Sequence, residues 1–185
     1  IPTMRSMVME FTEDKTCHYV DKQYMLGDNL LVAPIFNDQS MAEYYLPKGT
    51  WTNLLTGEVK EGGRWVNEKH GYLSIPLMVK ENSIVVLGAC DEKPDYDYGT
   101  DAEIRIYALK DGIQAKSVVY GMDQNEEISI TAEKNGNDIH VTIVSDKNYT
   151  IRLVNVSAVG DSAVKDGNDT VLTLSGNADF TLQIQ

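Results

Sequence analysis

Carboxylates and histidines are the residues of this sequence that could do chemistry, but their spacing predicts no site. His18, His70 and His140 each lack a second histidine or a cysteine at the short spacing that a zinc site requires. Two converging carboxylates could cleave a glycosidic bond, yet no spacing here indicates that two of the 28 acidic residues converge. Nucleophile elbows and phosphate-binding glycine loops are also missing from the sequence. We therefore assign no catalytic residue, no metal ligand and no cofactor-binding residue.

One acidic run has partial similarity to a calcium-binding loop. Asp95, Asp97, Gly99 and Asp101 alternate with other residues, as ligands do in such loops. Glycine stands where the EF-hand needs an oxygen ligand, and the closing glutamate is missing at the required spacing. A solvated linker is the preferred interpretation, and a calcium loop is the alternative.

Aromatic side chains are the second group with binding potential. Trp51 and Trp65, together with Tyr44, Tyr45 and Tyr72, could form a platform on which sugar rings stack. In a small β-sandwich such residues more often pack in the core or between domains. Both interpretations stay open at this point, and packing is the one we favour.

Composition limits the classes of partner. The 185 residues include 28 acidic and 16 basic side chains, for a net charge of −12, which argues against nucleic acid and anionic membranes as partners. The hydrophobic fraction of 42% is typical of a globular protein. The first residues lack the pattern of a signal peptide, so we expect a cytoplasmic bacterial protein. Cys17 and Cys90 are expected to be buried or half-buried free thiols.

The first 29 residues differ in pattern from the rest of the chain. The apolar stretch within Met4–Phe11 is compatible with a buried strand. The apolar positions of Lys15–Leu26 predict a short helix, and Gly27 stands where a helix C-terminal glycine belongs. A strand followed directly by a helix is half of a βα unit, which cannot bury its apolar surface alone.

From Leu30 onward the pattern predicts strands and turns. Lys80-Glu81-Asn82 is predicted to be a tight hairpin connection, since asparagine tolerates a positive φ. The polar stretch 91–97 is predicted to separate two modules. Beyond it the apolar residues alternate with polar ones, and turn signals recur every 8–12 residues, as in a β-sandwich. The alternating residues include Ile104, Ile106, Ile139, Val141 and Ile143.

Several segments together resemble the C-terminal end of glycoside hydrolase family 31, and especially its bacterial α-xylosidase branch. The most specific is the QYMLGDNLLVAP passage, and the others match the family's YLPxGxW…TGE stretch and its PLFVRxGSIIPxG-like hairpin. The similarity is strong over residues 2–90 and weaker over 91–185. The matching segments are Pro2–Phe11, Asp21–Pro34, Tyr45–Trp51, Leu55–Glu58 and Gly71–Gly88.

The resemblance implies a mainly β fold of two consecutive antiparallel β-sandwich domains. These are a proximal sandwich over 30–90 and a distal one over 91–185, preceded by a remnant strand–helix unit of a (β/α)8 barrel over 1–29. The family's two catalytic aspartates, one a nucleophile and one a general acid/base, lie on earlier barrel strands, so no residue of this chain takes their roles. Glu10, Phe11 and Thr12 would come nearest to the active site, at the end of barrel strand eight.

Three functions follow from these observations. The leading one is a non-catalytic part of a retaining α-glycosidase that supports the catalytic barrel, acts with it on α-xyloside or α-glucoside oligosaccharides, and can form a homo-oligomer. The barrel residues Met4, Met7, Met9 and Phe11 would then be exposed apolar surface unless they repack or a second copy covers them. The alternatives are a carbohydrate-binding β-sandwich module and an assembly domain unrelated to glycosidases.

Overall fold

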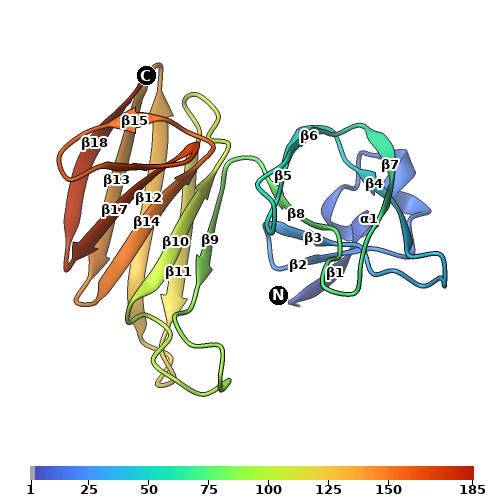
Figure 1. Cartoon of the computed structure of the whole chain (residues 1–185), viewed down its shortest axis with the longest axis horizontal. Helices are drawn as coiled ribbons and strands as arrows, with labels where there is room; N and C mark the ends of the chain where they lie inside the picture. Colours follow the sequence, from blue (N-terminus) through green and yellow to red (C-terminus); the bar gives the residue numbers. More distant parts are fainter. Residues whose placement is uncertain (1–2) are drawn as a thin grey trace. The chain divides into compact units, whose positions relative to one another are not determined.

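The computed structural model describes residues 3–185, and these divide into two units (Figure 1). The first unit ends at Glu81, and the second runs from Asn82 to Gln185. Both units consist mainly of β-strands, as the sequence predicted. Within the described part of the chain, no helix has both the length and the apolar character to cross a membrane.

The first unit is built from short strands and two helical turns. Its longer sheet has the strand order β1-β2-β3-β8-β5-β6 with antiparallel neighbours throughout, and β4 pairs with β7 in a separate antiparallel ladder. The elements are β1 (Met4–Ser6), α1 (Met7–Glu10), the 3-10 helix η1 (Lys15–His18), β2 (Tyr24–Leu26), β3 (Leu30–Val32), β4 (Met41–Leu46), β5 (Thr50–Asn53), β6 (Val59–Glu61), β7 (Arg64–Lys69) and β8 (Leu77–Lys80).

The core of the first unit forms around Trp51. Its indole is almost completely buried, and its N–H donates a 2.8 Å hydrogen bond to the carbonyl of Pro47, so the buried polar atom has a partner. The ring of Phe11 lies 6.2 Å away, centre to centre, and connects the end of α1 to this core. Further buried side chains around it include Met7, Met25, Leu31, Tyr44, Leu46 and Met78.

The predicted elements of the first 29 residues are wrong in two respects. The predicted strand within Met4–Phe11 ends at Ser6, and the chain then forms the four-residue helix α1. The predicted helix over Lys15–Leu26 is replaced by η1 and then by strand β2. Gly27 does have a positive φ, of 62°, but it turns the chain from β2 into β3 and does not end a helix.

Gln23 explains why this segment is extended. Its side chain is buried, accepts a 2.7 Å hydrogen bond from the Tyr45 main-chain N–H, and donates one of 2.7 Å to the Tyr45 carbonyl. The side chain therefore pairs with β4 as a strand would. The next residues, β2, pair with β1 on one side and β3 on the other. These long-range partners outweigh the local helical pattern, because a pattern of neighbouring residues contains no information about distant partners.

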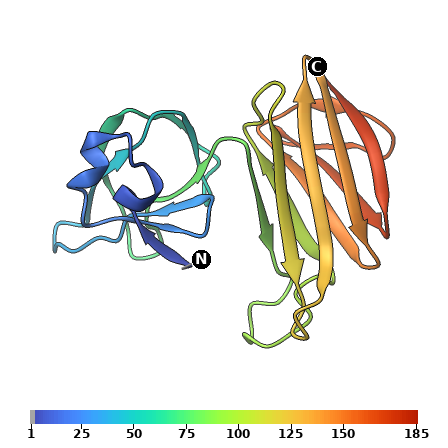
Figure 2. The ribbon, with the colours of Figure 1, turned by 180° about the vertical axis from the view of Figure 1, so that it is seen from behind.

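The second unit is a sandwich of two five-stranded sheets (Figure 2). One sheet has the order β16-β17-β14-β10-β9, and the other has the order β11-β12-β13-β18-β15. The strands are β9 (Ser83–Leu87), β10 (Ala102–Tyr107), β11 (Gln114–Tyr120), β12 (Glu126–Asn135), β13 (Asp138–Ser145), β14 (Asn148–Val154), β15 (Ala158–Val159), β16 (Val164–Asp166), β17 (Asp169–Ser175) and β18 (Ala178–Ile184).

The apolar residues that alternate with polar ones in the sequence form the core between these sheets. The alternating isoleucines and valines of β10, β12 and β13 are buried, as predicted, while His140 and Thr142 lie on the outer face. The neighbours in both sheets are antiparallel with one exception, since β10 and β14 run parallel. The buried residues include Ile104, Ile106, Ile128, Ile130, Ile139, Val141, Ile143, Ile151 and Leu153.

The predicted hairpin at Lys80-Glu81-Asn82 is wrong, because this tripeptide carries the chain from one unit to the other. β8 pairs with β3 and β5 in the first unit, whereas β9 pairs with β10 in the second. Asn82 does have the predicted positive φ, of 55°. Its main-chain N–H donates a 3.0 Å hydrogen bond to the carbonyl of Ala108, which fixes the entry into the second unit.

The structure groups the residues differently from the three segments expected from the sequence. β2 and β3 lie on either side of the expected boundary at 29/30 but are neighbours in one sheet. β9 precedes the expected boundary at 90/91 but belongs to the second unit, so the polar stretch 91–97 is a loop inside that unit.

Candidate functional site

The residues expected nearest an active site do lie together on the surface of the first unit. Glu10, Phe11 and Thr12 follow α1 and line a pocket of about 290 Å³ with Pro47 and Lys48. Glu13 and Asp14 complete the lining. The pocket contains carboxylates and one lysine, but no hydrogen-bonded pair that resembles a nucleophile and its base. Its chemistry is therefore that of a binding or packing surface.

Arg5 organises the charged groups beside α1. Its guanidinium donates a 2.8 Å hydrogen bond to the carbonyl of Gly27 and pairs with the carboxylates of Asp28 and Glu10, the latter at 3.4 Å. Lys80 lies 4.0 Å from the other oxygen of Glu10. The Arg5 Nε atom is buried and has no hydrogen-bond partner among residues 3–185. The cluster connects β1, the β2–β3 turn and the end of β8.

Apolar side chains are exposed next to this cluster. Met4, Val8, Met9 and Leu26 form what we call the N-terminal apolar surface, and Met9 is 61% exposed. Met4 and Leu26 stand opposite each other in the β1–β2 ladder, so their side chains share one face of the sheet. The expectation that Met4 and Met9 are exposed is confirmed. Met7 follows the stated alternative of repacking, since α1 turns its side chain into the core, and Phe11 packs against the same core.

The five aromatic residues considered as a sugar platform do not form one. Trp51 is only 1% exposed, and Tyr44 and Tyr45 are buried, so packing is the correct interpretation for these three. Trp65 is 53% exposed and lies opposite Tyr45, with ring centres 5.6 Å apart. Tyr72 is fully exposed in the turn that follows β7.

A partly buried polar network surrounds Glu68 on β7. The Tyr44 hydroxyl donates a 2.8 Å hydrogen bond to one carboxylate oxygen, His70 lies 3.0 Å from the same oxygen, and Lys60 pairs with the other. Although burial acts to raise the pKa of Glu68, the hydrogen bonds from Lys60, Tyr44 and His70 lower it. Every polar group here has a partner, which is typical of a structural network.

The three histidines occupy unrelated positions. His70 hydrogen-bonds to the Ser74 hydroxyl at 3.1 Å, in the turn that follows β7. His140 lies on the outer face of β13, near Thr181, and His18 lies 2.8 Å from the carbonyl of Thr12. Within residues 3–185, no three histidine, cysteine, aspartate or glutamate side chains gather as metal ligands do.

Both cysteines are free thiols, as the sequence predicted. Cys17 is buried in the core of the first unit. Burial, with a smaller contribution from the charge of Asp14, raises its pKa to about 11. Cys90 is half-buried in the second unit. A thiol with a raised pKa is a poor nucleophile at neutral pH, so Cys17 is a packing residue.

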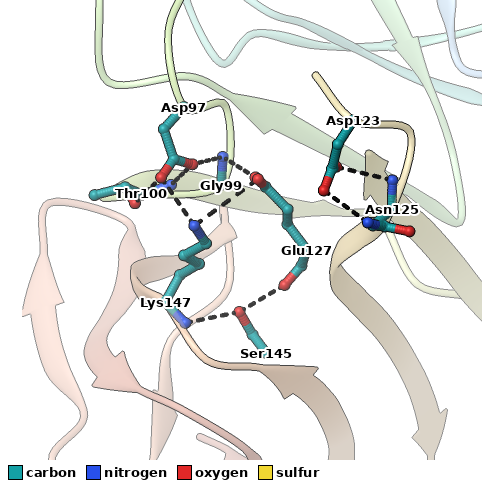
Figure 3. Close-up of polar contacts among 8 residues, drawn as sticks. All are labelled: Asp97, Gly99, Thr100, Asp123, Asn125, Glu127, Ser145 and Lys147. Carbon is teal, nitrogen blue, oxygen red and sulfur yellow. Dashed lines mark hydrogen bonds and ion pairs between the residues drawn. The ribbon is translucent and has the colours of Figure 1, made fainter. Parts of the chain in front are cut away.

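The acidic run considered as a calcium loop forms a different structure, centred on Lys147 (Figure 3). The Lys147 ammonium lies 2.8 Å from Asp97 and 3.8 Å from Glu127. Asp97 also accepts hydrogen bonds from the Thr100 hydroxyl and main chain, and Glu127 accepts one of 3.0 Å from the Gly99 N–H. Of the carboxylates in the acidic run, Asp97 is thus paired with a lysine ammonium, and hydrogen bonds to Asp97 and Glu127 order the loop.

A group of tyrosines in the second unit gives little signal in the sequence. Tyr96, Tyr98 and Tyr120 line a pocket of about 370 Å³ together with Ser117 and Gly88, and Val86, Val118 and Val119 complete the lining. The only sequence signal is the Tyr-x-Tyr spacing within a stretch assigned to a linker. Tyr120 joins the other two only through the fold, because it lies on β11 and they lie in the loop between β9 and β10.

Two family models match the chain, one in each half. Residues 1–85 match the model described as "Glycosyl hydrolase family 31 C-terminal domain", and residues 97–184 match the model described as "Alpha-xylosidase YicI, C-terminal domain". Alpha-xylosidase XylQ from Lactiplantibacillus pentosus is 38% identical over 98% of this chain. The match covers 23% of the length of XylQ, so the chain spans about a quarter of that relative.

Solved structures of the same family have the same fold. A dextranase of this family from Flavobacterium johnsoniae superposes with a TM-score of 0.79 over 99% of this chain and 29% of its own, at 18% identity. An α-xylosidase from Xanthomonas citri gives 0.71 over 99% of this chain and 22% of its own, at 22% identity. At such identities the likeness concerns the fold. The sequence matches and the shared architecture together establish that the chain belongs to glycoside hydrolase family 31, as a C-terminal region close to those of α-xylosidases.

Proposed function

We propose that this chain is the non-catalytic C-terminal part of a retaining α-glycosidase of the α-xylosidase type. The complete protein would hydrolyse O-glycosyl bonds of α-xyloside or α-glucoside oligosaccharides in carbohydrate metabolism. The observation that carries the proposal is the 38% identity to Alpha-xylosidase XylQ over 98% of this chain but only 23% of XylQ. In this proposal the rest of the enzyme, including its catalytic aspartates, belongs to segments upstream.

The N-terminal apolar surface gives this proposal a physical basis. Exposed methionines beside a partly unpartnered arginine are costly in water and favourable when a matching surface covers them. We infer that the upstream part of the catalytic barrel covers Met4, Val8, Met9 and Leu26, and that the pocket at Glu10–Thr12 lies where the last barrel strand would end. The chain would then support the barrel and its loops.

Two further properties belong to the same proposal. A second copy of the protein could cover part of the exposed surface, which would make the complete enzyme a homo-oligomer. The two free cysteines are consistent with a reducing cytoplasm, which is where we place the protein in this proposal.

The test compares the 185-residue chain with a longer protein of this family that ends in it. The purified chain should not hydrolyse an aryl α-xyloside or an aryl α-glucoside, whereas the longer protein should hydrolyse at least one of them. Hydrolysis by the 185-residue chain that survives a second purification would contradict the assignment of catalysis to upstream segments. A longer protein without α-glycosidase activity would contradict the assignment of the whole.

A further inference from the structure

We propose that the second unit carries a binding pocket for a neutral sugar, formed by Tyr96, Tyr98 and Tyr120. The pocket of about 370 Å³ is within the range of small-molecule sites, which run from about 300 to 1,000 Å³, and has room for one or two sugar rings. This inference does not depend on the proposed function, because sugar binding by the chain is measured without any hydrolysis.

Edge strands of both sheets contribute residues to this pocket. β9 is the last strand of one sheet and β11 is the last strand of the other, so no further described strand pairs with the outward sides of Val86 on β9 and of Ser117–Tyr120 on β11. Val86 and Gly88 contribute from the β9 side, and Ser117 to Tyr120 contribute from β11. Unpaired N–H and C=O groups at an edge can exchange hydrogen bonds with sugar hydroxyls.

Gly88 allows Tyr96 to reach this edge. A Cβ atom added to Gly88 would lie 1.7 Å from the Tyr96 hydroxyl oxygen, so only glycine leaves room for the phenol. The ring of Tyr98 lies 4.9 Å from that of Tyr96 in an edge-to-face arrangement, and the Tyr98 hydroxyl donates to the carbonyl of Pro94. The Tyr96 hydroxyl has no hydrogen-bond partner among residues 3–185, which leaves it available to a ligand.

Tyr120 completes the pocket from the opposite strand. It is 53% exposed and lies opposite Glu126, beside a shift of the β11–β12 register whose extra residue, Glu127, belongs to β12. Such a bulge increases the local twist of the strand pair, and a twisted edge discourages the addition of a further strand. The edge therefore favours a small ligand over a peptide that would extend the sheet.

The chemistry of the lining selects a neutral sugar. None of the lining side chains is charged, and the chain as a whole carries a net charge of −12, which disfavours anions. Tyrosine offers an apolar face for the C–H groups of a pyranose ring and a hydroxyl for its oxygen atoms. Ser117 adds a second hydroxyl to the same wall.

Calorimetric titration of the 185-residue chain with isoprimeverose and with maltose tests the proposal. We expect saturable binding of at least one of them, which Tyr120→Ala weakens by about tenfold or more. Tyr96→Phe keeps the ring and should weaken binding less, through loss of the hydroxyl alone. Tyr72→Ala is the matched control, since Tyr72 is a fully exposed tyrosine of the first unit and should leave binding unchanged.

Amide chemical shifts give a second measurement that does not depend on the variants folding well. Titration of the unmodified chain should move the resonances of residues 86–88, 96–98 and 117–120 and leave those of residues 70–75 in place. Absence of saturable binding, shifts confined to other residues, or an equal loss with Tyr72→Ala would each overturn the proposal. Binding of an extended peptide at β11 without binding of either sugar would overturn it in favour of strand addition.

Discussion

The ammonium group of Lys147 lies 2.8 Å from a carboxylate oxygen of Asp97, fifty positions earlier in the chain. The contact ties the loop that precedes β10 to the turn between β13 and β14 (Figure 3). Hydrogen bonds from Lys147 and Thr100 lower the pKa of the Asp97 carboxyl well below its usual value. The same hydrogen bond raises the pKa of Lys147.

These shifts predict a contribution to stability that depends on pH. A carboxyl whose pKa is lowered by folding stabilises the protein above its unfolded pKa, about 3.9 for aspartate, and the effect disappears as the pH falls through the folded pKa. We expect Asp97→Asn to lower the free energy of unfolding in urea at pH 7, and the difference from wild type to shrink below about pH 4. For Lys147, whose pKa folding raises, the contribution is complete below about pH 10.4 and disappears at higher pH.

Asp161→Asn is the matched control, because Asp161 is exposed and has no hydrogen bond or ion pair to any of residues 3–185. It should have little effect at either pH. An equal loss of stability in Asp97→Asn at pH 7 and at about pH 2.5 would show that the ion pair is not the cause.

The two cysteines should differ in reactivity. A maleimide or disulfide reagent at neutral pH should modify Cys90 in the folded chain and leave Cys17 unmodified, since Cys17 is buried and its pKa is raised to about 11. Mass spectrometry after proteolysis locates the label. In urea both thiols should react at similar rates, and rapid labelling of Cys17 in the folded Cys90→Ser variant would contradict the structure.

Gln23 should contribute more to stability than any exposed glutamine. Gln23→Ala leaves both main-chain hydrogen-bonding groups of Tyr45 without their partner in a buried position. We expect a loss of about 2 kcal/mol in the free energy of unfolding. Gln183→Ala, at an exposed position of β18, should change it by less than about 0.5 kcal/mol. Similar values for the two variants would contradict the role given to Gln23.

A charge introduced at Met9 tests whether the catalytic barrel covers the N-terminal apolar surface. Met9→Glu places a charge where the proposed barrel contact excludes water, so a longer protein of this family carrying it should lose activity or soluble yield. Met122→Glu is a matched control, since both methionines are 61% exposed. In the 185-residue chain both variants should stay within about 0.5 kcal/mol of wild type. Full activity of the longer Met9→Glu protein would contradict the contact.

The sequence predicted the second unit better than the first. Alternation of isoleucine and valine with polar residues identifies a buried face wherever a sheet covers one side only, as at Ile139, Val141 and Ile143. Around Gln23 the conformation depends on Tyr45, which is 22 positions away. A local pattern does not contain that partner, so the segment was predicted as a helix.

The same limit applies to the candidate sites. The resemblance to the family indicated Glu10, Phe11 and Thr12, which the structure does bring to one pocket. The family is also shown by the comparisons, and this excludes the interpretation as an unrelated assembly domain. The tyrosine pocket needs Tyr96 from the loop after β9 and Tyr120 from β11, and the order of residues does not reveal that these two segments meet.

The parallel pairing of β10 with β14 has a consequence for synthesis of the protein on the ribosome. β10 ends at Tyr107, and its parallel neighbour is complete only at Val154. Until that residue has left the exit tunnel, β10 has only β9 beside it, and the nascent sandwich exposes the apolar face of the opposite sheet. Pairings of such long sequence separation form slowly, so this interval is when the growing polypeptide most needs a chaperone.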